Sequence, residues 1–329
     1  MPELPEVEHV RRGLRARLIG AVVVDATLIR ADMLRFSAFA PAPDPLGRLR
    51  GTELREVHRH GKFLALEFTR GSDEGPRRGR GIEPEETSAA VLGLHLGMAG
   101  RIILAAPASR PLPHAHAQVR FELGEGGSTA TELRFHDPRR FGGLWMNRTL
   151  DEHRRQAWCA LGPDALESDP AELAAHMAQS LRRTRRTIKA VLLDQRVIAG
   201  IGNIYADEIL HRSGIDPRSI ARRLPTRSVG SLLRAAREIL ASAVEAGGST
   251  IRDHIGVDGI AGTYRTQHAV YGQAGAPCPR CGSTIRQASI AGRTTAFCPF
   301  CQSRGGTRRL SRSQSARVVQ APDSPTRAP

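Results

Sequence analysis

The first eight residues of this 329-residue chain, Met-Pro-Glu-Leu-Pro-Glu-Val-Glu, place a secondary amine beside carboxylates. If Met1 is removed, Pro2 becomes the N-terminus, and an α-amino group with a pKa of about 8 is partly neutral at neutral pH. A neutral amine attacks electrophilic carbons such as C1 of a sugar, and the product can become a Schiff base. Glu3 and Glu6 are three residues apart and share a helix face. Taken alone, the octapeptide favours two prolines that merely shape a helix start. An amine nucleophile with carboxylate partners is a hypothesis that depends on the motifs further along the chain.

Lysine is almost absent from the chain. Only two of the 48 lysine and arginine residues are lysines, Lys62 and Lys189. Arginine does not give up its proton in a protein, whereas lysine can. A lysine that persists where arginine supplies nearly all the positive charge is a candidate for chemistry, with chance survival as the alternative. For Lys189, within a helical pattern, a structural or phosphate-facing role is favoured.

Four of the five cysteines form the pattern C-x2-C-x16-C-x2-C. Each C-x-x-C knuckle places two thiolates on one tetrahedral ion, so the pattern predicts a closed structural zinc site without an open catalytic position. Two disulfides would fit a secreted protein instead. The fifth cysteine, Cys159, is predicted to be a buried small hydrophobe. The predicted zinc ligands are Cys278, Cys281, Cys298 and Cys301.

The charge balance indicates a polyanionic partner. The formal net charge is +15 and the isoelectric point is about 11.0. Nucleic acid is the first expectation for so basic a chain, and an acidic membrane surface is the second. We find no long apolar segment and no signal-peptide pattern, so we expect a cytoplasmic, nucleoid-associated monomer that does not contact membranes.

The N-terminal half alternates one helix with many short strands. Apolar residues recur at helical spacing from Pro5 to Leu18, with arginines between them. A segment at 70–88, rich in Gly, Arg and Glu, is predicted to be a solvated insertion. Many short strands separated by turns favour a β-sandwich. The predicted strands are 21–29, 53–57, 62–68, 90–96, 101–104, 117–123, 131–135 and 143–146.

The pattern becomes helical after about residue 150. Ile198–Asn203 contains glycines that permit a sharp turn and a close backbone approach. Helices on both sides of this turn resemble a helix-turn-helix unit, in which a helix N-terminus can bind phosphate. The predicted helices are 171–180, 187–193, 202–212 and 226–246, and the predicted domains are 1–150, 151–275, 276–303 and a disordered basic tail at 304–329.

Five motifs in this order resemble the bacterial formamidopyrimidine-DNA glycosylases, and the resemblance runs from residue 2 to about 302. They are Pro2-Glu3-Leu4-Pro5-Glu6-Val7-Glu8, His95-Leu-Gly-Met98-Ala-Gly100, Asp137-Pro-Arg139-Arg-Phe141-Gly142, Gly200-Ile-Gly-Asn203-Ile-Tyr-Ala-Asp-Glu208 and the four cysteines. The resemblance implies an α+β multidomain fold: an N-terminal β-sandwich flanked by helices, a helix-two-turn-helix domain and a C-terminal zinc finger. It also implies base excision repair of oxidised purines in duplex DNA, followed by β- and δ-elimination.

The resemblance assigns catalytic roles to five residues. Pro2 would attack C1′ of the damaged nucleotide, and Glu3 would protonate the ring oxygen and assist elimination. Glu6 matches the second carboxylate of the site. Lys62, in His-Gly-Lys-Phe, matches a lysine that contacts phosphate and assists elimination. Arg293, on the finger, would grip the phosphates beside the lesion and assist the δ step.

Further residues match DNA contacts of the family. Met98, Arg139 and Phe141 match the residues that fill the gap left by an extruded base, which offsets part of a cost of a few kcal/mol in stacking and pairing. Asn203 resembles a phosphate ligand at a helix start. A loop over the lesion is expected at 249–264, where Thr263-Tyr264-Arg265 stands in place of an aromatic pair. Weaker matches to backbone contacts are His95, His114 and Arg185.

Two alternatives remain at this point. The endonuclease VIII branch of the same superfamily prefers oxidised pyrimidines, but Leu4 and the Met98, Arg139 and Phe141 set argue against it. A noncatalytic zinc-ribbon DNA-binding protein would keep the ribbon and the helix turns. Intact Pro2, Glu3 and Lys62 argue against that second reading.

Overall fold

The computed structural model describes residues 1–39, 44–70, 88–107, 113–123, 129–249, 256–257, 259 and 261–304. Nearly all of the predicted insertion and tail, and half of the loop expected over the lesion, lie outside these residues. Two compact units are present. Unit 1 comprises Met1–Ser168, Gln195–Gly202 and Leu240–Thr266, and unit 2 comprises Asp169–Asp194, Asn203–Ile239 and the described chain from Gln267 onward. Because each unit draws on separate stretches, the predicted boundary at residue 150 stays a prediction.

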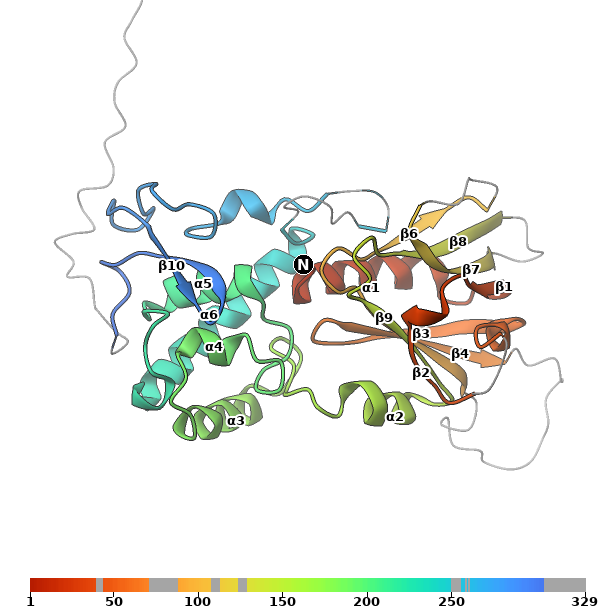
Figure 1. Cartoon of the computed structure of the whole chain (residues 1–329), viewed down its shortest axis with the longest axis horizontal. Coiled ribbons are helices and arrows are strands. Elements are labelled where there is room, and N and C mark those ends of the chain that lie inside the picture. Colours follow the sequence, from red (N-terminus) through yellow and green to blue (C-terminus); the bar gives the residue numbers. More distant parts are fainter. Residues whose placement is uncertain are drawn as a thin grey trace, which may run out of the picture. The chain divides into compact units, whose positions relative to one another are not determined.

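Helix α1 (Leu4–Leu18) opens unit 1 (Figure 1). Its apolar residues recur every three or four positions, which gives the helix one apolar face. Glu3 is the N-cap, and Glu6 reaches back so that its Oε2 accepts the Glu3 backbone N–H at 2.9 Å. This is one half of a capping box, and it fixes the helix start at the residue after Glu3. The buried face consists of Leu4, Val7, Val10, Leu14 and Leu18, all 0% exposed.

Nine strands of unit 1 form one hydrogen-bonded sheet in the order β2-β9-β5-β4-β3-β1-β7-β8-β6. Strands β1 and β3 are joined by a single pair, Val22 with Glu53, where the sheet folds over on itself. The fold creates two layers, as the predicted sandwich requires. The strands are β1 (Val22–Leu28), β2 (Leu34–Ser37), β3 (Thr52–His60), β4 (Phe63–Arg70), β5 (Ser88–His95), β6 (Arg101–Ala105), β7 (Ala115–Leu123), β8 (Thr129–His136) and β9 (Gly143–Asn147).

Unit 1 also contains α2 (Leu150–His153), which continues as one π-helical turn, Arg154–Trp158. Helix α6 (Thr226–Glu245) begins in unit 2 and ends in unit 1. Short 3₁₀ turns complete the described chain: Ala31–Met33, Gly47–Leu49, Ala221–Arg223 and Tyr264–Gln267.

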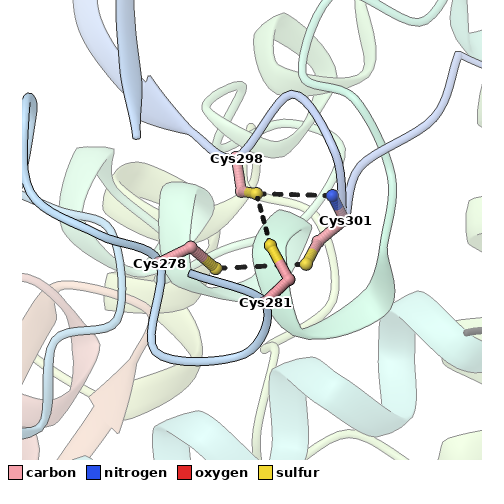
Figure 2. A group of neighbouring side chains, drawn as sticks. All are labelled: Cys278, Cys281, Cys298 and Cys301. Atoms are coloured by element: carbon pink, nitrogen blue, oxygen red, sulfur yellow. Dashed lines mark hydrogen bonds between the residues drawn. The ribbon is translucent and has the colours of Figure 1, made fainter. Parts of the chain in front are cut away.

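Unit 2 combines helices with a small hairpin. The helices are α3 (Pro170–Arg182), α4 (Ile188–Leu192) and α5 (Asn203–Ser213). Strands β10 (Arg286–Ile290) and β11 (Arg293–Phe297) pair antiparallel. Ala291 and Gly292 between them both have positive φ, 52° and 68°, the signature of a type I′ turn. The four C-x-x-C cysteines cluster beside this hairpin (Figure 2).

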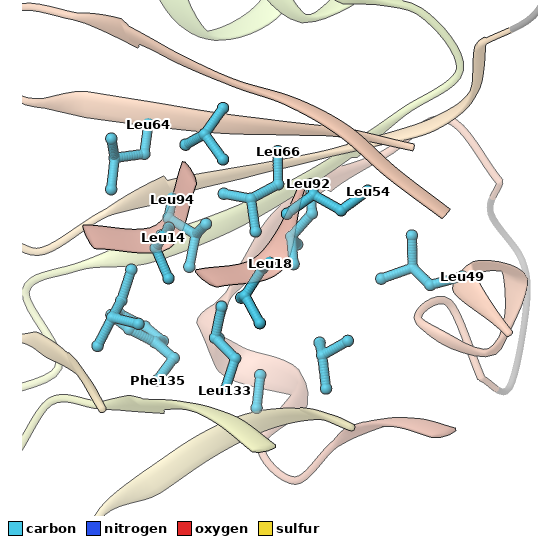
Figure 3. Close-up of a cluster of buried hydrophobic side chains, with 14 of the residues drawn as sticks. Leu14, Leu18, Leu49, Leu54, Leu64, Leu66, Leu92, Leu94, Leu133 and Phe135 are labelled. Atoms are coloured by element: carbon cyan, nitrogen blue, oxygen red, sulfur yellow. The ribbon is translucent and has the colours of Figure 1, made fainter. Parts of the chain in front are cut away.

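The core of unit 1 lies between the two sheet layers and α1. In Figure 3, Leu64 and Leu66 face Leu133 and Phe135 from opposite sides, with Leu14 of α1 among them. Phe68 of β4 also stacks on Phe121 of β7, with ring centroids 6.4 Å apart. The N-terminal helix is therefore part of the core, so the position of its first turn is fixed by packing.

The predicted elements agree well with the structure. All eight predicted strands and five predicted helices are present within a few residues, and the predicted fold class is confirmed. Strand β2, α2 and the finger hairpin were not predicted. The prediction for Cys159 is wrong: it is exposed, since it follows the π-helical turn at the surface. Among the described residues, no helix combines the length and the apolarity needed to cross a membrane.

Leu14→Ala should destabilise the protein by about 2–5 kcal/mol, because it removes a fully buried side chain and leaves a cavity. Ile19→Ala, 45% exposed at the end of the same helix, is the control and should cost less than about 1 kcal/mol. Urea unfolding measures both changes. Equal losses would show that α1 is not part of the core.

Candidate functional site

The Glu3 carboxylate is buried at the start of α1. It is 2% exposed, and its Oε2 accepts the backbone N–H of Gly202 at 2.8 Å. The Leu4 N–H donates to the Gly200 carbonyl at 3.1 Å. A Cβ at Gly202 would overlap the Glu3 carboxyl group, so only glycine allows this approach. The close backbone approach predicted for the glycine turn is therefore observed, and it orients Glu3.

The Glu6 carboxylate is held from two directions. Besides the Glu3 N–H, it accepts the Ser249 N–H at 2.6 Å through Oε1. Glu6 thus ties the first turn of α1 to the residue at which the predicted lesion loop begins. Pro2 lies buried next to these carboxylates, and Met1 is 49% exposed and accessible to removal.

Lys62 lies in the two-residue turn between β3 and β4. His60 pairs with Phe63, which leaves Gly61 and Lys62 as the loop. Gly61 has a φ of 56°, and a Cβ there would lie 2.8 Å from the Ala199 Cβ. Lys62 is 5% exposed, which excludes a solvated surface lysine. Burial and the tight turn together limit the positions that the Lys62 ammonium can take.

Two imidazoles of unit 1 stay neutral at neutral pH. Burial and the nearby charge of Lys62 lower the pKa of His95 to about 4, which places His95 close to Lys62. Its Nδ1 accepts the Gly97 N–H, and its ring packs on Phe63 with centroids 4.4 Å apart. Burial also lowers the pKa of His153 to about 4. A neutral His95 can donate and accept hydrogen bonds without adding charge.

A pinned loop presents two of the predicted gap-filling residues. The buried Asp137 carboxylate accepts the N–H of Arg139 at 3.2 Å and that of Gly142 at 2.8 Å. The Arg139 guanidinium lies over the Phe141 ring at 4.8 Å, and Phe141 is 56% exposed. A Cβ at Gly97 would overlap the Gly142 nitrogen, so the Met98 loop runs beside this one. The structure brings Met98, Arg139 and Phe141 into one region.

The weaker DNA-contact predictions are placed less closely. His114 is exposed, and its carbonyl accepts the Asp137 N–H at 3.2 Å, so it lies beside the pinned loop. Arg185 is exposed in unit 2 after the end of α3. No described contact groups Arg185 with the other predicted site residues.

In unit 2, the hairpin turn lies against the start of α5. The Asn203 Nδ2 donates to the Thr294 carbonyl at 3.1 Å, directly after the exposed Arg293. Lys189 is fully buried and donates to Asp207 Oδ1 at 2.6 Å and to Thr295 Oγ1 at 2.7 Å. These two hydrogen bonds inside unit 2 favour the structural role for Lys189 over the phosphate-facing one. The hydrogen bond from Asn203 therefore brings the start of α5 next to the turn that carries Arg293.

The four cysteines fit one tetrahedral ion. Their sulfur atoms all lie within 4.8 Å of one another, with Cys278 to Cys301 at 3.9 Å and Cys281 to Cys298 at 3.5 Å (Figure 2). A Zn–S bond of about 2.3 Å separates tetrahedral sulfurs by about 3.8 Å. The Cys301 N–H donates to the Cys298 sulfur, as expected for a thiolate ligand. The site holds one structural zinc ion with four protein ligands.

Sequence reasoning missed three charged residues that organise unit 1. Asp137 was read only as part of a motif, although its carboxylate shapes the loop that follows it. Arg59 and Asp164 were not singled out, yet both are buried and paired, with Nη1 of Arg59 2.5 Å from Oδ2 of Asp164. Their spacing in sequence, 105 residues, gave no signal.

A buried carboxylate site at a helix start, a glycine turn beside it and a helical unit with a four-cysteine zinc site are the features expected of a zinc-containing DNA repair enzyme. Family models match along most of the chain: the formamidopyrimidine-DNA glycosylase N-terminal domain at residues 1–144, the H2TH domain of the same enzymes at 161–254 and the zinc finger found in FPG and IleRS at 275–304. The chain belongs to the formamidopyrimidine-DNA glycosylase (Fpg) family. It is a DNA glycosylase of base excision repair, in a family whose members are also abasic-site lyases.

Full-length relatives agree with this assignment. The formamidopyrimidine-DNA glycosylase of Thermus thermophilus is 40% identical over 93% of this chain and 100% of its own length. The crystal structure of a Thermus thermophilus Fpg superposes with a TM-score of 0.72, at 38% identity over 92% of this chain and 98% of that one. A Lactococcus lactis Fpg variant in complex with Fapy-dG-containing DNA gives a TM-score of 0.76, at 30% identity over 92% and 99% of the two chains.

Stability should fall as the pH drops from about 6.5 to about 4. His95 and His153 have lowered pKa values in the folded state, so the unfolded chain binds more protons in this window. His153→Gln should reduce the slope by up to about 1.4 kcal/mol per pH unit. Urea unfolding at several pH values measures the slope, with His9→Gln as the control. An unchanged slope in His153→Gln would contradict the neutral imidazole.

Cys281→Ser should lower bound zinc from one ion per chain toward none, because three thiolates bind less tightly than four. The exposed Cys159 provides the matched control, and Cys159→Ser should keep one zinc. Elemental analysis by mass spectrometry measures the content, and fluorescence anisotropy measures DNA binding. Full zinc occupancy in Cys281→Ser would exclude this residue as a ligand.

Proposed function

We propose that this protein excises oxidised purines, chiefly 8-oxoguanine and formamidopyrimidines, from duplex DNA and then cuts the strand by β- and δ-elimination. The observation that supports this most is the start of α1, where two buried carboxylates follow the buried Pro2 within four residues. Glu3 and Glu6 are each 2% exposed and are fixed by backbone N–H donors. Such fixed carboxylates suit acid–base work on a nearby amine adduct.

The proposed reaction begins at Pro2. Its neutral nitrogen forms a bond with C1′ while the bond from C1′ to the damaged base breaks, and the N–H proton of Pro2 passes to the departing base. Glu3 gives a proton to the sugar ring oxygen, the ring opens and an iminium ion links Pro2 to the sugar. Loss of a C2′ proton then expels the 3′ phosphate, and a second elimination expels the 5′ phosphate. Glu6 holds the helix start in place, and Lys62 contacts phosphate and assists the eliminations.

We propose that Met98, Arg139 and Phe141 occupy the space left by the extruded nucleotide. The stacking of Arg139 on Phe141 supports this, because a cation over a ring presents a flat, amphipathic wedge. Arg139 would also donate hydrogen bonds to the orphaned base, which in this family is usually cytosine. His114 would add a contact beside this loop.

Two residues of unit 2 are the main proposed phosphate contacts. Asn203 at the start of α5 and Arg293 at the hairpin turn would bind phosphates beside the lesion, and Arg293 would assist the δ step. Neutral His95 and cationic Arg185 are weaker candidates. Because the chain is strongly basic, binding should weaken with salt as counterions are released. We propose that the enzyme acts as a monomer on damaged duplex DNA at the nucleoid.

The main alternative is a preference for oxidised pyrimidines. One structural neighbour, a Lactococcus lactis Fpg complex, contains an oxidised pyrimidine in its DNA, and others contain Fapy-dG or an abasic site. Lesion preference must therefore be tested directly. Rates on duplexes with 8-oxoguanine and with an oxidised pyrimidine, each opposite its usual partner, compare the two readings.

Borohydride should trap the protein covalently on duplex DNA that contains one 8-oxoguanine opposite cytosine. Reduction converts the iminium ion into a stable amine, so the adduct should map by mass spectrometry to Pro2. A mature chain that begins at Pro2 must be confirmed beforehand. A cross-link at a lysine, or none with either 8-oxoguanine or an abasic site, would overturn the proposed nucleophile.

Two variants separate the roles at this site. Glu3→Gln should abolish base excision and leave DNA binding within about threefold of wild type, because the amide keeps the shape of the side chain but cannot give up a proton. Pro2→Gly should keep an amine and trap less adduct. Full excision by Glu3→Gln would refute its acid–base role.

A further inference from the structure

The guanidinium of Arg59 joins three segments of unit 1. Its Nε donates to Glu8 Oε2 on α1 at 2.9 Å, and its Nη1 donates to Asp164 Oδ2 at 2.5 Å. Nη1 also donates to the Gly61 carbonyl at 3.2 Å, and Nη2 lies 3.0 Å from Glu167 Oε1. The Arg59 side chain is 0% exposed. All three of its nitrogens are engaged inside the protein.

These bonds fix the turn that bears Lys62 on both sides of Gly61. The Gly61 N–H donates to Asp164 Oδ2 at 2.7 Å, while the Gly61 carbonyl accepts from Arg59. The Gly61 carbonyl belongs to the peptide plane that joins Gly61 to Lys62. Since a peptide is planar, holding its carbonyl also holds the Lys62 nitrogen. The base of the lysine side chain is therefore fixed by Arg59.

The same group fixes the helix of the proposed nucleophile. Glu8 lies on α1, whose first turn follows directly from Pro2. The contacts continue around a closed circuit: Ala199 N–H donates to the Pro163 carbonyl, and Leu4 N–H donates to the Gly200 carbonyl. Gly61 packs against Ala199 in turn. Arg59 therefore sets the position of the Lys62 turn relative to the start of α1.

The charges within the cluster support one another. Burial alone would raise the pKa of the Asp164 carboxyl, but Arg59 and backbone N–H donors outweigh burial and the net pKa is lowered. The pKa of Glu8 is likewise lowered, because Arg11 and Arg59 outweigh burial. Both carboxylates stay ionised at neutral pH. Removing Arg59 would leave buried negative charge beside the site, at a cost that a change of geometry would relieve.

We infer that Arg59 is a positioning residue for Lys62, which places the lysine ammonium relative to the Pro2 amine through Asp164 and Gly61. The inference rests on the proposed roles of Pro2 and Lys62. Arg59 touches no reacting atom, and the start of α1 is also held by the Gly200 carbonyl and the Gly202 N–H. The loss of Arg59 should therefore act through Lys62 and matter only while Lys62 is present. Arg59→Lys keeps the positive charge but loses the positioning role. One ammonium cannot reproduce the planar guanidinium that reaches Glu8, Gly61 and Asp164 together.

The test measures single-turnover strand cleavage of a duplex with one abasic site, for each variant in wild-type and Lys62→Ala backgrounds. Arg59→Lys should slow cleavage at least tenfold in the wild-type background and less than twofold in Lys62→Ala. The control is Arg134→Lys, which changes an equally buried arginine paired with Glu132 at 2.6 Å. Arg134→Lys should change the rate less than twofold in both backgrounds.

Asp164→Asn is the second variant, and it serves as the test if Arg59→Lys does not fold. It keeps the volume of the side chain but removes its charge. It should show the same dependence on Lys62, with zinc content and near-ultraviolet circular dichroism like those of the wild type. A wild-type rate for folded Arg59→Lys and Asp164→Asn, or losses that multiply with that of Lys62→Ala, would overturn the inference.

The same experiment distinguishes failure of the inference from failure of the proposed function. If Lys62→Ala is slow and the borohydride adduct maps to Pro2 while Arg59→Lys cleaves normally, only the inference is wrong. If Lys62→Ala cleaves at the wild-type rate, the proposed role of Lys62 falls, and the positioning role falls with it.

Discussion

The N-cap and the first two turns of α1 bury three carboxylates, and much of unit 1 is organised around satisfying them. Glu3, Glu6 and Glu8 are each 2–3% exposed. A buried charge is tolerated only with close donors, because desolvation otherwise costs several kcal/mol. The donors come from distant parts of the chain: the N–H of Gly202 for Glu3, that of Ser249 for Glu6 and the guanidinium of Arg59 for Glu8. Each carboxylate therefore recruits one segment to the proposed site.

In unit 2, buried carboxylates on helix α5 likewise accept hydrogen bonds from distant backbone N–H groups. Asp207 of α5 accepts the Ala296 N–H, and Glu208 accepts three backbone N–H groups from residues 269–271. His211, one turn further on, lies 3.3 Å from the Cys278 sulfur. A zinc hairpin is too small to form a core by itself and depends on its metal. The helix adds a second set of fixed contacts, so the position of the hairpin turn follows from α5 as well as from zinc.

The sequence was sufficient for features that depend on local patterning. Helix α1, the eight strands and the four-cysteine site follow from spacing and composition. Strand β2 was missed because it is only four residues long and lies at the sheet edge, where it pairs parallel with β9. The partners of Arg59 could not be predicted, because a charge in a basic chain gives no sign of which distant carboxylate it meets. The roles of Lys62 and Lys189 likewise could not be distinguished from the sequence. Both lysines are buried, and only their neighbours in the fold differ.

The exposed ring of Phe141 lies on a loop that hydrogen bonds hold in place. An aromatic ring that is 56% exposed gives up the transfer free energy that burial would supply, so packing of the free protein does not explain it. Hydrogen bonds nevertheless hold the loop in place. Asp137 accepts two of its N–H groups, and the Arg35 guanidinium donates to the Gly142 carbonyl at 2.8 Å. A side chain fixed in advance loses little conformational entropy on binding. An exposed ring on a fixed loop suits the role proposed for Phe141, because a gap in a base stack has the flat, apolar walls that such a ring fits.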